Sequence, residues 1–306
     1  MKLKRKLAVV VWLALGAGGA AAQERDWSKV EIKTEQLAPG IWMLEGAGGN
    51  IGVSAGEDGV FLIDDQYAPL TAKIKAAVAA VSPKPIRFVL NTHWHGDHTG
   101  GNENLGKGGV LIVAHDNVRR RLSAEQFSTL WQRTTPPSPP GALPVVTFSD
   151  TVTFHLNGEE VHAFHLAPAH TDGDAAVHFR RADVLHTGDV FFNGRYPYID
   201  VDAGGSLKGV IAAADRLLAL AGPRTRIIPG HGPRAGVAEL RAYREMLAAA
   251  LARVEPLVRA GKSVEEIVAL RPMAEFDEKW GQDFMKPDIF LRLLHLSLSR
   301  DLTPAR

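Results

Sequence analysis

The chain has 306 residues, 45% of them hydrophobic and 23% charged, which is enough for one large globular domain or two small ones. Cysteine is absent, which excludes disulfides, thiolate metal ligands and a cysteine nucleophile. The formal net charge of +1 indicates no electrostatic surface for nucleic acid.

Residues 1–22 have the composition of a cleavable secretory signal. Four basic residues precede an apolar run over 7–15, and alanines end the segment at 20–22. The alternative is a transmembrane anchor, but the apolar part is shorter than the roughly 20 residues that a span needs. We therefore expect cleavage near Ala22, export to the periplasm and no membrane anchor afterwards. The leader holds four of the 35 Lys and Arg and none of the 34 Asp and Glu, so the mature chain would carry a net charge of −3.

The first part of the mature chain alternates between strand and helix patterns. Short apolar or alternating runs separated by glycine predict antiparallel strands at 40–46, 50–56 and 59–65. An alanine-rich segment predicts a helix over 68–81, and the continuous apolar run 86–92 predicts a buried strand.

The segment after residue 108 is less regular. Residues 109–115 predict another buried strand, and 116–133 predict a helix with a basic face. Five prolines within 134–144 exclude regular structure and predict a stiff surface loop. We expect this loop to be a connector, the alternative being the rim of a site.

The second half repeats this style. Strand patterns occupy 151–158, 159–168, 175–189 and 225–232, and helix patterns occupy 207–222, 236–254, 263–271 and 287–302. Since both halves combine hairpins with helices, the economical packing is two sheets face to face with helices on both outer surfaces. We expect an α/β protein in which residues 23–235 form this domain and 236–306 form a helical extension of two or three helices packed on it.

The stretch NTHWHGDHTGG, residues 91–101, follows the predicted buried strand directly. Sites in α/β proteins lie at the carboxyl ends of strands, so a functional loop is expected here. His93 and His95 are two residues apart and would project from the same side of an extended segment, where they can share one metal ion. Gly96 would then let the chain turn.

Asp97 and His98 are adjacent and must diverge, so they would supply ligands to a second ion. Three more potential ligands follow predicted strands, namely His170, Asp189 and His231. If the two halves stack, these loops converge on one edge. Nitrogen and oxygen donors without thiolate suit zinc.

This ordered set, HxHxDH followed by AHT, TGD and PGHG, resembles the metallo-β-lactamase-fold hydrolases over roughly residues 40–235. The resemblance implies a four-layer αββα sandwich. It also implies two zinc ions, one held by His93, His95 and His170, the other by Asp97, His98 and His231, with Asp189 bridging them.

Three other polar residues lie near this set. Asp64 and Asp65 end a predicted strand, and either would orient a ligating histidine by accepting its second N–H or would cap a helix. His186 lies inside a predicted strand close to Asp189, where it would face away from the ions or lie beneath them rather than bind them.

The implied metal pair suggests a mechanism. Two zinc ions roughly 3.5–4 Å apart lower the pKa of a shared water toward ~7, while one ion polarises the bond under attack. The ions would thereby supply the nucleophile, so that no side chain would need to attack the substrate. Asp97 would be catalytic, because it would orient this nucleophile and pass its proton to the leaving group.

The substrate is less well defined by the sequence. Broad-spectrum zinc β-lactamases carry a cysteine where Asp189 stands and a lysine shortly after it, and both are missing here. The aspartate instead resembles that of glyoxalase II, lactonase and phosphodiesterase-like relatives. Asn193, Arg195 and Tyr196 are predicted substrate-binding residues, and with Tyr198 in the same string they would hold an anion and stack on a ring. The alternative is an ordinary turn with surface aromatics.

We therefore expect an exported dizinc hydrolase that opens a small cyclic amide or ester, β-lactams included. The alternatives are a glyoxalase II-like thioesterase, a lactonase or phosphodiesterase, a persulfide dioxygenase-like iron enzyme, and a non-catalytic metal-binding accessory protein of a periplasmic redox system. The expected partner is a small-molecule substrate. The sequence indicates no nucleic-acid partner and no particular oligomeric state.

Overall fold

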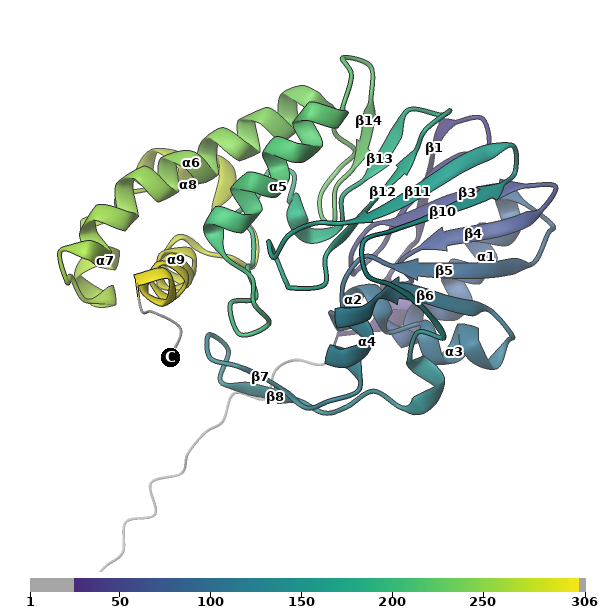
Figure 1. Cartoon of the computed structure of the whole chain (residues 1–306), viewed down its shortest axis with the longest axis horizontal. Coiled ribbons are helices and arrows are strands. Elements are labelled where there is room, and N and C mark those ends of the chain that lie inside the picture. The colour runs from purple at the N-terminus through teal and green to yellow at the C-terminus, as the bar shows by residue number, and fades with distance from the viewer. Residues whose placement is uncertain (1–24, 303–306) are drawn as a thin grey trace, which may run out of the picture.

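A computed structural model describes residues 25–302, so the expected leader at 1–22 lies outside the described residues. Two large β-sheets lie face to face, and helices cover the outer surface of each (Figure 1). This arrangement is the αββα sandwich that the alternating patterns predicted. None of the helices within 25–302 has the length and hydropathy required to cross a bilayer.

The first sheet contains most of the N-terminal half. Its strands are, in order, β1 (Lys33–Ala38), β2 (Ile41–Glu45), β3 (Ile51–Gly56), β4 (Gly59–Ile63), β5 (Ile86–Asn91), β6 (Leu111–His115) and β9 (Val146–Phe148). The pairs from β1 to β4 are antiparallel, and those from β4 to β9 are parallel. Strands β4, β5 and β6 therefore end at the same edge of the sheet.

The second sheet contains five strands of the C-terminal half. They are, in order, β10 (Thr151–Leu156), β11 (Glu159–His165), β12 (Ala175–Phe179), β13 (Val184–His186) and β14 (Arg226–Ile228). The last pair, β13 and β14, is parallel, and the others are antiparallel. Strands β13 and β14 thus deliver their following loops to one place.

Helices lie on both outer surfaces. Those of the first half are α1 (Thr71–Val81), α2 (Gly96–Thr99), α3 (Asn102–Lys107) and α4 (Asp116–Leu122). Those of the second half are α5 (Leu207–Leu220), α6 (Val237–Arg259), α7 (Val264–Leu270), α8 (Ala274–Trp280) and α9 (Pro287–Leu302). Figure 1 shows α5, α6 and α9 together on the side of the second sheet.

Strand β4 shows how the layers are held together. Its five residues are all buried, because side chains alternate between the two faces and both faces are covered. Phe61 and Ile63 join the core between the sheets, whereas Leu62 packs with Ile74 and Val78 of α1. Each such buried side chain contributes about 1.5–3 kcal/mol of hydrophobic free energy.

The C-terminal tail packs on the second sheet. Leu217 of α5, Leu247 of α6 and Phe290 of α9 share one core with Ile227 of β14. Within 237–302 the tail forms four helices rather than the two or three expected. The additional helix is α8, whose seven residues are too few to show a helical period in the sequence. Its Trp280 is nevertheless buried in this core.

The predicted helix over 116–133 is wrong beyond Leu122. Helix α4 ends there, and the chain continues as a hairpin of β7 (Gln126–Ser128) and β8 (Arg133–Thr135). The hairpin is fixed by a distant residue, because Asp202 accepts hydrogen bonds from the backbone N–H and the hydroxyl of Thr129 at 2.6 and 3.0 Å. Such a tertiary contact overrides local helical preference.

Candidate metal centre

The seven predicted ligands meet at the edge where the strands of both sheets end. His93 and His95 lie in the loop after β5, and Asp97 and His98 lie in α2. The other three follow β11, β13 and β14, and they are His170, Asp189 and His231. The side chains form two groups, and within each group the donor atoms lie within 4.8 Å of one another. The first group is His93, His95, His170 and Asp189, and the second is Asp97, His98 and His231.

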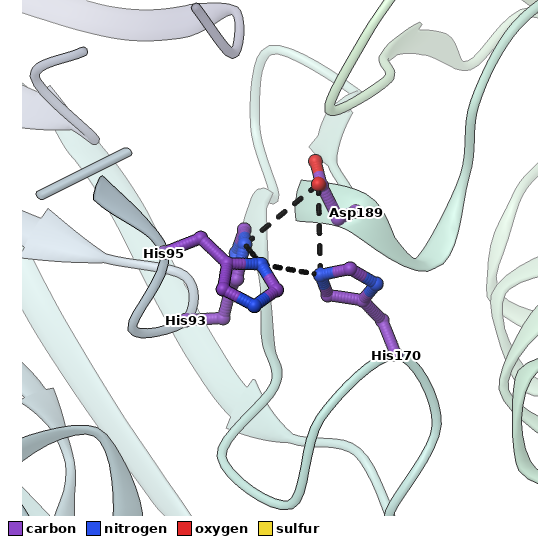
Figure 2. A group of neighbouring side chains, drawn as sticks. All are labelled: His93, His95, His170 and Asp189. Atoms are coloured by element: carbon purple, nitrogen blue, oxygen red, sulfur yellow. Dashed lines mark hydrogen bonds and ion pairs between the residues drawn. The ribbon is translucent and has the colours of Figure 1, made fainter. Parts of the chain in front are cut away.

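The first group converges on one point, as Figure 2 shows. Nδ1 of His95 lies 3.1 Å from Nε2 of His93 and 2.9 Å from Nε2 of His170. Oδ2 of Asp189 lies 3.7 Å from Nε2 of His93 and 3.6 Å from Nε2 of His170. His93 thus faces this point with its Nε2 and His95 with its Nδ1. This difference lets two residues of one loop face the same point.

The imidazoles of this group are in the form that binds metal. Burial, followed by the nearby His98, lowers the pKa of His93 well below its usual value. Burial also lowers the pKa of His170 to about 4. Both rings are therefore neutral at pH 7, and a neutral imidazole has the free lone pair that a ligand needs.

The second group lies beside the first. Nε2 of His231 is 3.4 Å from Nε2 of His98 and 3.2 Å from Oδ2 of Asp97. Asp189 joins the groups, because its Oδ1 lies 3.1 Å from His98 Nε2 and its Oδ2 lies 3.4 Å from His231 Nε2. The carboxylate of Asp189 therefore lies where a ligand shared by two ions would be.

The charges of the second group fit a cation as well. Burial opposes protonation of His231, but the carboxylates of Asp189 and Asp97 outweigh it and raise its pKa to about 9. The same carboxylates, with Asp64, raise the pKa of the buried His98. Protons on these two rings thus occupy positions that a divalent metal would take.

Asp189 provides a direct test of fit. Burial opposes its ionisation, but His98 and His231 outweigh this effect and hold its pKa well below the usual value. Its buried Oδ1 makes no hydrogen bond of standard geometry with the residues at 25–302, and its 3.1 Å contact with Nε2 of His98 is an ion pair. A buried, ionised oxygen needs a compensating charge, and a metal ion held between it and His98 would supply one. The donor set of five imidazoles and two carboxylates therefore fits a metal centre.

Of the two neighbouring aspartates, Asp64 contacts a ligating histidine and Asp65 does not. Asp64 Oδ2 lies 2.7 Å from Nδ1 of His98, and it also accepts the Thr92 hydroxyl at 2.7 Å. This contact leaves Nε2 of His98 facing His231, the other histidine of the second group. Asp65 Oδ1 accepts the backbone N–H of Gly101 at 2.9 Å, the residue that precedes α3. The helices that follow β4 have Tyr67 and Leu70 as their N-caps. The orienting interpretation therefore holds for Asp64, and the capping interpretation holds for neither residue.

Asp200 has an equivalent role that the sequence did not indicate. Its Oδ2 lies 2.9 Å from Nε2 of His95, the nitrogen opposite the metal-facing Nδ1. The carboxylate is buried, but the hydrogen bond and charge of His95 outweigh burial and lower the pKa of Asp200. His170 is oriented by a main-chain group, since its Nδ1 lies 2.8 Å from the carbonyl of Tyr198.

His186 supports the site from below. The ring is fully buried, and its Nε2 lies 3.1 Å from the carbonyl oxygen of Asn50. Its Nδ1 accepts the backbone N–H of Gly188 at 3.2 Å. The residue thus holds the turn that precedes Asp189 and does not belong to either metal-binding group.

Two glycines are required by close approach to the ligands. A Cβ atom at Gly230 would lie 2.0 Å from Oδ1 of Asp189, and one at Gly49 would lie 2.0 Å from Cε1 of His98. Gly96, in contrast, begins α2 and has space around it, since an added Cβ would meet nothing within 4 Å. The expected turn at Gly96 therefore does not depend on glycine.

A pocket of about 730 Å³ opens over the metal centre. Four predicted ligands line it, namely His95, Asp97, Asp189 and His231. The walls come from the β7–β8 hairpin, including Thr135, and from the segments around Tyr198 and Phe284. The hairpin and the start of the proline-rich loop thus form part of the rim, which corrects our expectation of a mere connector.

The three predicted substrate-binding residues have different surroundings. Arg195 lines the pocket, and its Nη1 lies 2.5 Å from Oδ2 of Asp283. Asn193 does not line the pocket as far as residues 25–302 define it, and its Nδ2 donates to the carbonyl of Pro233 at 3.0 Å. Asn193 therefore braces the turn that carries His231.

Tyr196 requires a correction. Its side chain is fully buried, stacks on Phe290 with ring centroids 4.1 Å apart, and donates its hydroxyl to Asp277 at 3.0 Å. The prediction of a substrate-binding Tyr196 is wrong, because α8 and α9 cover the ring. Tyr198, the other tyrosine of this string, does line the pocket.

Comparisons with known proteins agree with this geometry. The model of the metallo-β-lactamase superfamily matches residues 44–231, and the chain belongs to this superfamily. Its fold is similar to that of a metallo-β-lactamase from Pontibacter korlensis, with a TM-score of 0.59, 19% identity and coverage of 71% of this chain and 99% of that one. The DIM-1 metallo-β-lactamase also gives a TM-score of 0.59, at 16% identity over 72% of this chain and 100% of that one.

Curated relatives show varied activities. The chain is 25% identical to the 2,4-dinitroanisole O-demethylase subunit alpha of Nocardioides sp. (strain JS1661), over 85% of this chain and 76% of the relative. It is 25% identical to an acyl-coenzyme A thioesterase of Gallus gallus, over 62% and 71%. It is 30% identical to a hydroxyacylglutathione hydrolase of Gloeobacter violaceus, over 44% and 49%. The chain is thus a metal-dependent hydrolase with a His and Asp metal-binding cluster.

Proposed function

We propose that the protein is an exported dizinc hydrolase that opens a small cyclic amide or ester, β-lactams included. The observation that carries the proposal is the open side of the metal centre. Ligands from both groups, including His95 and His231, line the same pocket. Structural zinc sites are closed, whereas catalytic sites keep an open position, so this arrangement favours catalysis over the accessory-protein alternative.

Zinc is the proposed metal because the donor set is rich in imidazole. Five histidines and two aspartates are available, and no thiolate exists in the chain. Imidazole and carboxylate together suit zinc. Two zinc ions, when bound, supply a water of lowered pKa and polarise the bond under attack.

The surrounding residues would position the reaction. Asp97 faces the pocket, and its Oδ2 lies 3.2 Å from His231 Nε2. Burial raises its pKa, but His98 and His231 outweigh burial and lower it, so Asp97 is ionised at neutral pH and can accept a hydrogen bond from a water molecule. It would hold the attacking water in orientation and transfer its proton to the leaving group.

Thioester hydrolysis is the second candidate, and the relatives favour it. Two of the proteins that resemble this chain are named as an acyl-coenzyme A thioesterase and a hydroxyacylglutathione hydrolase. No lysine directly follows Asp189 to hold the carboxylate of a lactam drug. A pocket of about 730 Å³ is large enough for an acyl group together with part of its leaving group.

Export is supported by the composition of residues 1–22, with its basic start, apolar run and alanine-rich end. We expect the mature protein to begin near Gln23 and to fractionate with the periplasm of a double-membraned cell. N-terminal sequencing of the secreted protein tests this point. Material that begins at Met1 would contradict it.

A substrate panel tests the activity. The purified mature protein is assayed with a chromogenic cephalosporin, a homoserine lactone, an acyl thioester and a phosphodiester, each with and without a chelator. We expect turnover of the cephalosporin or the lactone, lost with the chelator and restored by zinc. Turnover of the thioester alone would establish the second candidate in its place. Turnover of the phosphodiester alone, or of no substrate, would overturn both.

A further inference from the structure

We propose that Phe127, Trp131 and Phe284 form an aromatic rim that selects substrates with a flat aromatic group next to the scissile bond. The proposal rests on the hydrolytic function above and adds the substrate class. The exposed fractions of these side chains are 52%, 42% and 46%. No other Phe or Trp at 25–302 is among the exposed large hydrophobic residues, and all three line the pocket over the metal centre.

Their position is informative because exposed aromatic rings are unfavourable in water. The other exposed large hydrophobic side chains are aliphatic, and none of them lines this pocket: Leu111, Val145, Val146, Leu220, Leu270 and Leu302. An apolar patch within a polar surface marks a ligand or partner site. Here the patch continues into a pocket with metal ligands at its base, so a small-molecule ligand is the occupant that fits.

The rim is connected to the metal centre by one further ring. The centroid of Trp131 lies 6.1 Å from that of Tyr198, and the ring of Tyr198 lies 5.6 Å from that of His95. Aromatic pairs interact favourably at centroid separations of 4.5–7 Å. A substrate ring lying along this wall would place the adjoining acyl carbon toward the ligand His95.

The hairpin that carries Phe127 and Trp131 is anchored to the second half of the chain through Asp202. Thr129 is bound by Asp202, and Asp202 also pairs with Arg300 of α9. Figure 1 shows the hairpin extending from the body of the fold beneath the second half of the molecule. A rim that is already ordered loses little entropy when a ligand binds.

Phe284 approaches from the opposite half of the chain. It follows Asp283, which pairs with Arg195 at 2.5 Å. The rim therefore combines a hairpin at 126–135 with a segment between α8 and α9, and only the fold brings them together. Neither segment contains a metal ligand. Changes in their sequence can therefore alter substrate preference without changing the metal centre.

The test compares two substrates with the same scissile bond. Phenylacetyl and acetyl derivatives of whichever bond class is hydrolysed are assayed with the zinc-loaded protein. We expect the ratio of their kcat/KM values to fall about tenfold in Trp131→Ala and several-fold in Phe127→Ala and Phe284→Ala. The conservative variant Trp131→Phe should retain most of the preference.

Leu270→Ala is the matched control, because Leu270 is 54% exposed and lies away from the pocket. It should leave the ratio unchanged. Zinc content and thermal unfolding of every variant show whether the fold is intact. A ratio that is equal in wild type and Trp131→Ala would overturn the proposal, and so would a change of oligomeric state without a change of ratio.

A binding measurement separates this proposal from the proposed hydrolysis. Phenylacetate and acetate are titrated calorimetrically into the zinc-loaded protein, which requires no turnover. We expect phenylacetate to bind at least about tenfold more tightly, with the advantage reduced in Trp131→Ala. Equal affinities in wild type would contradict the rim. Selective binding in a protein that hydrolyses none of the substrates would support the rim and refute the hydrolysis.

Discussion

Asp200 Oδ2 lies 2.9 Å from Nε2 of His95, so a buried carboxylate fixes the ring whose Nδ1 faces the other ligands. Replacing Asp200 by Asn should weaken zinc binding roughly 10–100-fold, because the ring would lose its orientation and part of its basicity. Competition with a fluorescent zinc chelator measures this change. The control is Asp202→Asn. Asp202 lies in the same loop as Asp200, but its carboxylate contacts Thr129 of the hairpin and no ligating histidine. Equal zinc affinity in wild type and Asp200→Asn would exclude the orienting role.

The glycines of the site provide a steric prediction. Gly230→Ala would place a methyl group 2.0 Å from Oδ1 of Asp189 and should displace the carboxylate, so that the purified protein loses at least one zinc equivalent. Gly96→Ala lies within the ligand motif but meets no atom within 4 Å, and its zinc content should match wild type. Elemental analysis compares the two. Full zinc content in Gly230→Ala would show that the turn can move aside.

Tyr196 should affect stability and not substrate binding. Its hydroxyl donates to Asp277 in a buried setting, so Tyr196→Phe should lower the free energy of unfolding by about 0.5–1.5 kcal/mol. Tyr196→Ala also removes the ring and should cost about 3–5 kcal/mol. Denaturant unfolding measures both values. A raised KM in Tyr196→Phe, with unchanged stability, would restore Tyr196 to the pocket.

Arg195 tests whether the pocket recognises an anion. Its side chain lines the pocket but is paired with Asp283. We expect Arg195→Ala to raise the KM of anionic substrates several-fold with little change for small neutral ones. Asp283→Asn should have the opposite effect on anions, because it removes the competing carboxylate. Equal effects on both substrate classes would assign Arg195 to holding the loop.

The ligand set was predictable because the histidine loop at 91–101 and the three later ligands each follow a strand pattern. The alternation of hairpins and helices likewise predicted two stacked sheets. His93, His170 and His231 are far apart in the sequence, yet their loops had to share one edge once the sheets faced each other. The fold and the ligand cluster were thus both predictable from short sequence patterns, which can be recognised without knowledge of tertiary contacts.

The remaining features depend on tertiary contacts. The β7–β8 hairpin has strands of three residues, too short for a recognisable period, and it is fixed by Asp202, some 70 residues away. Asp200 is one of several acids in a loop, and no spacing distinguishes it. Tyr196 is predicted to bind substrate because it stands beside Arg195 in the string after Asp189, whereas α8 and α9 bury it. Each of these assignments required the packing of the C-terminal half.

The metal content of the mature protein tests the central claim most directly. Elemental analysis by mass spectrometry is performed on protein purified without added metal or chelator. We expect about two zinc ions per chain, because the seven ligands form two groups joined by Asp189, and each group can complete a site with water. A single iron ion per chain would contradict the assignment of a dizinc hydrolase.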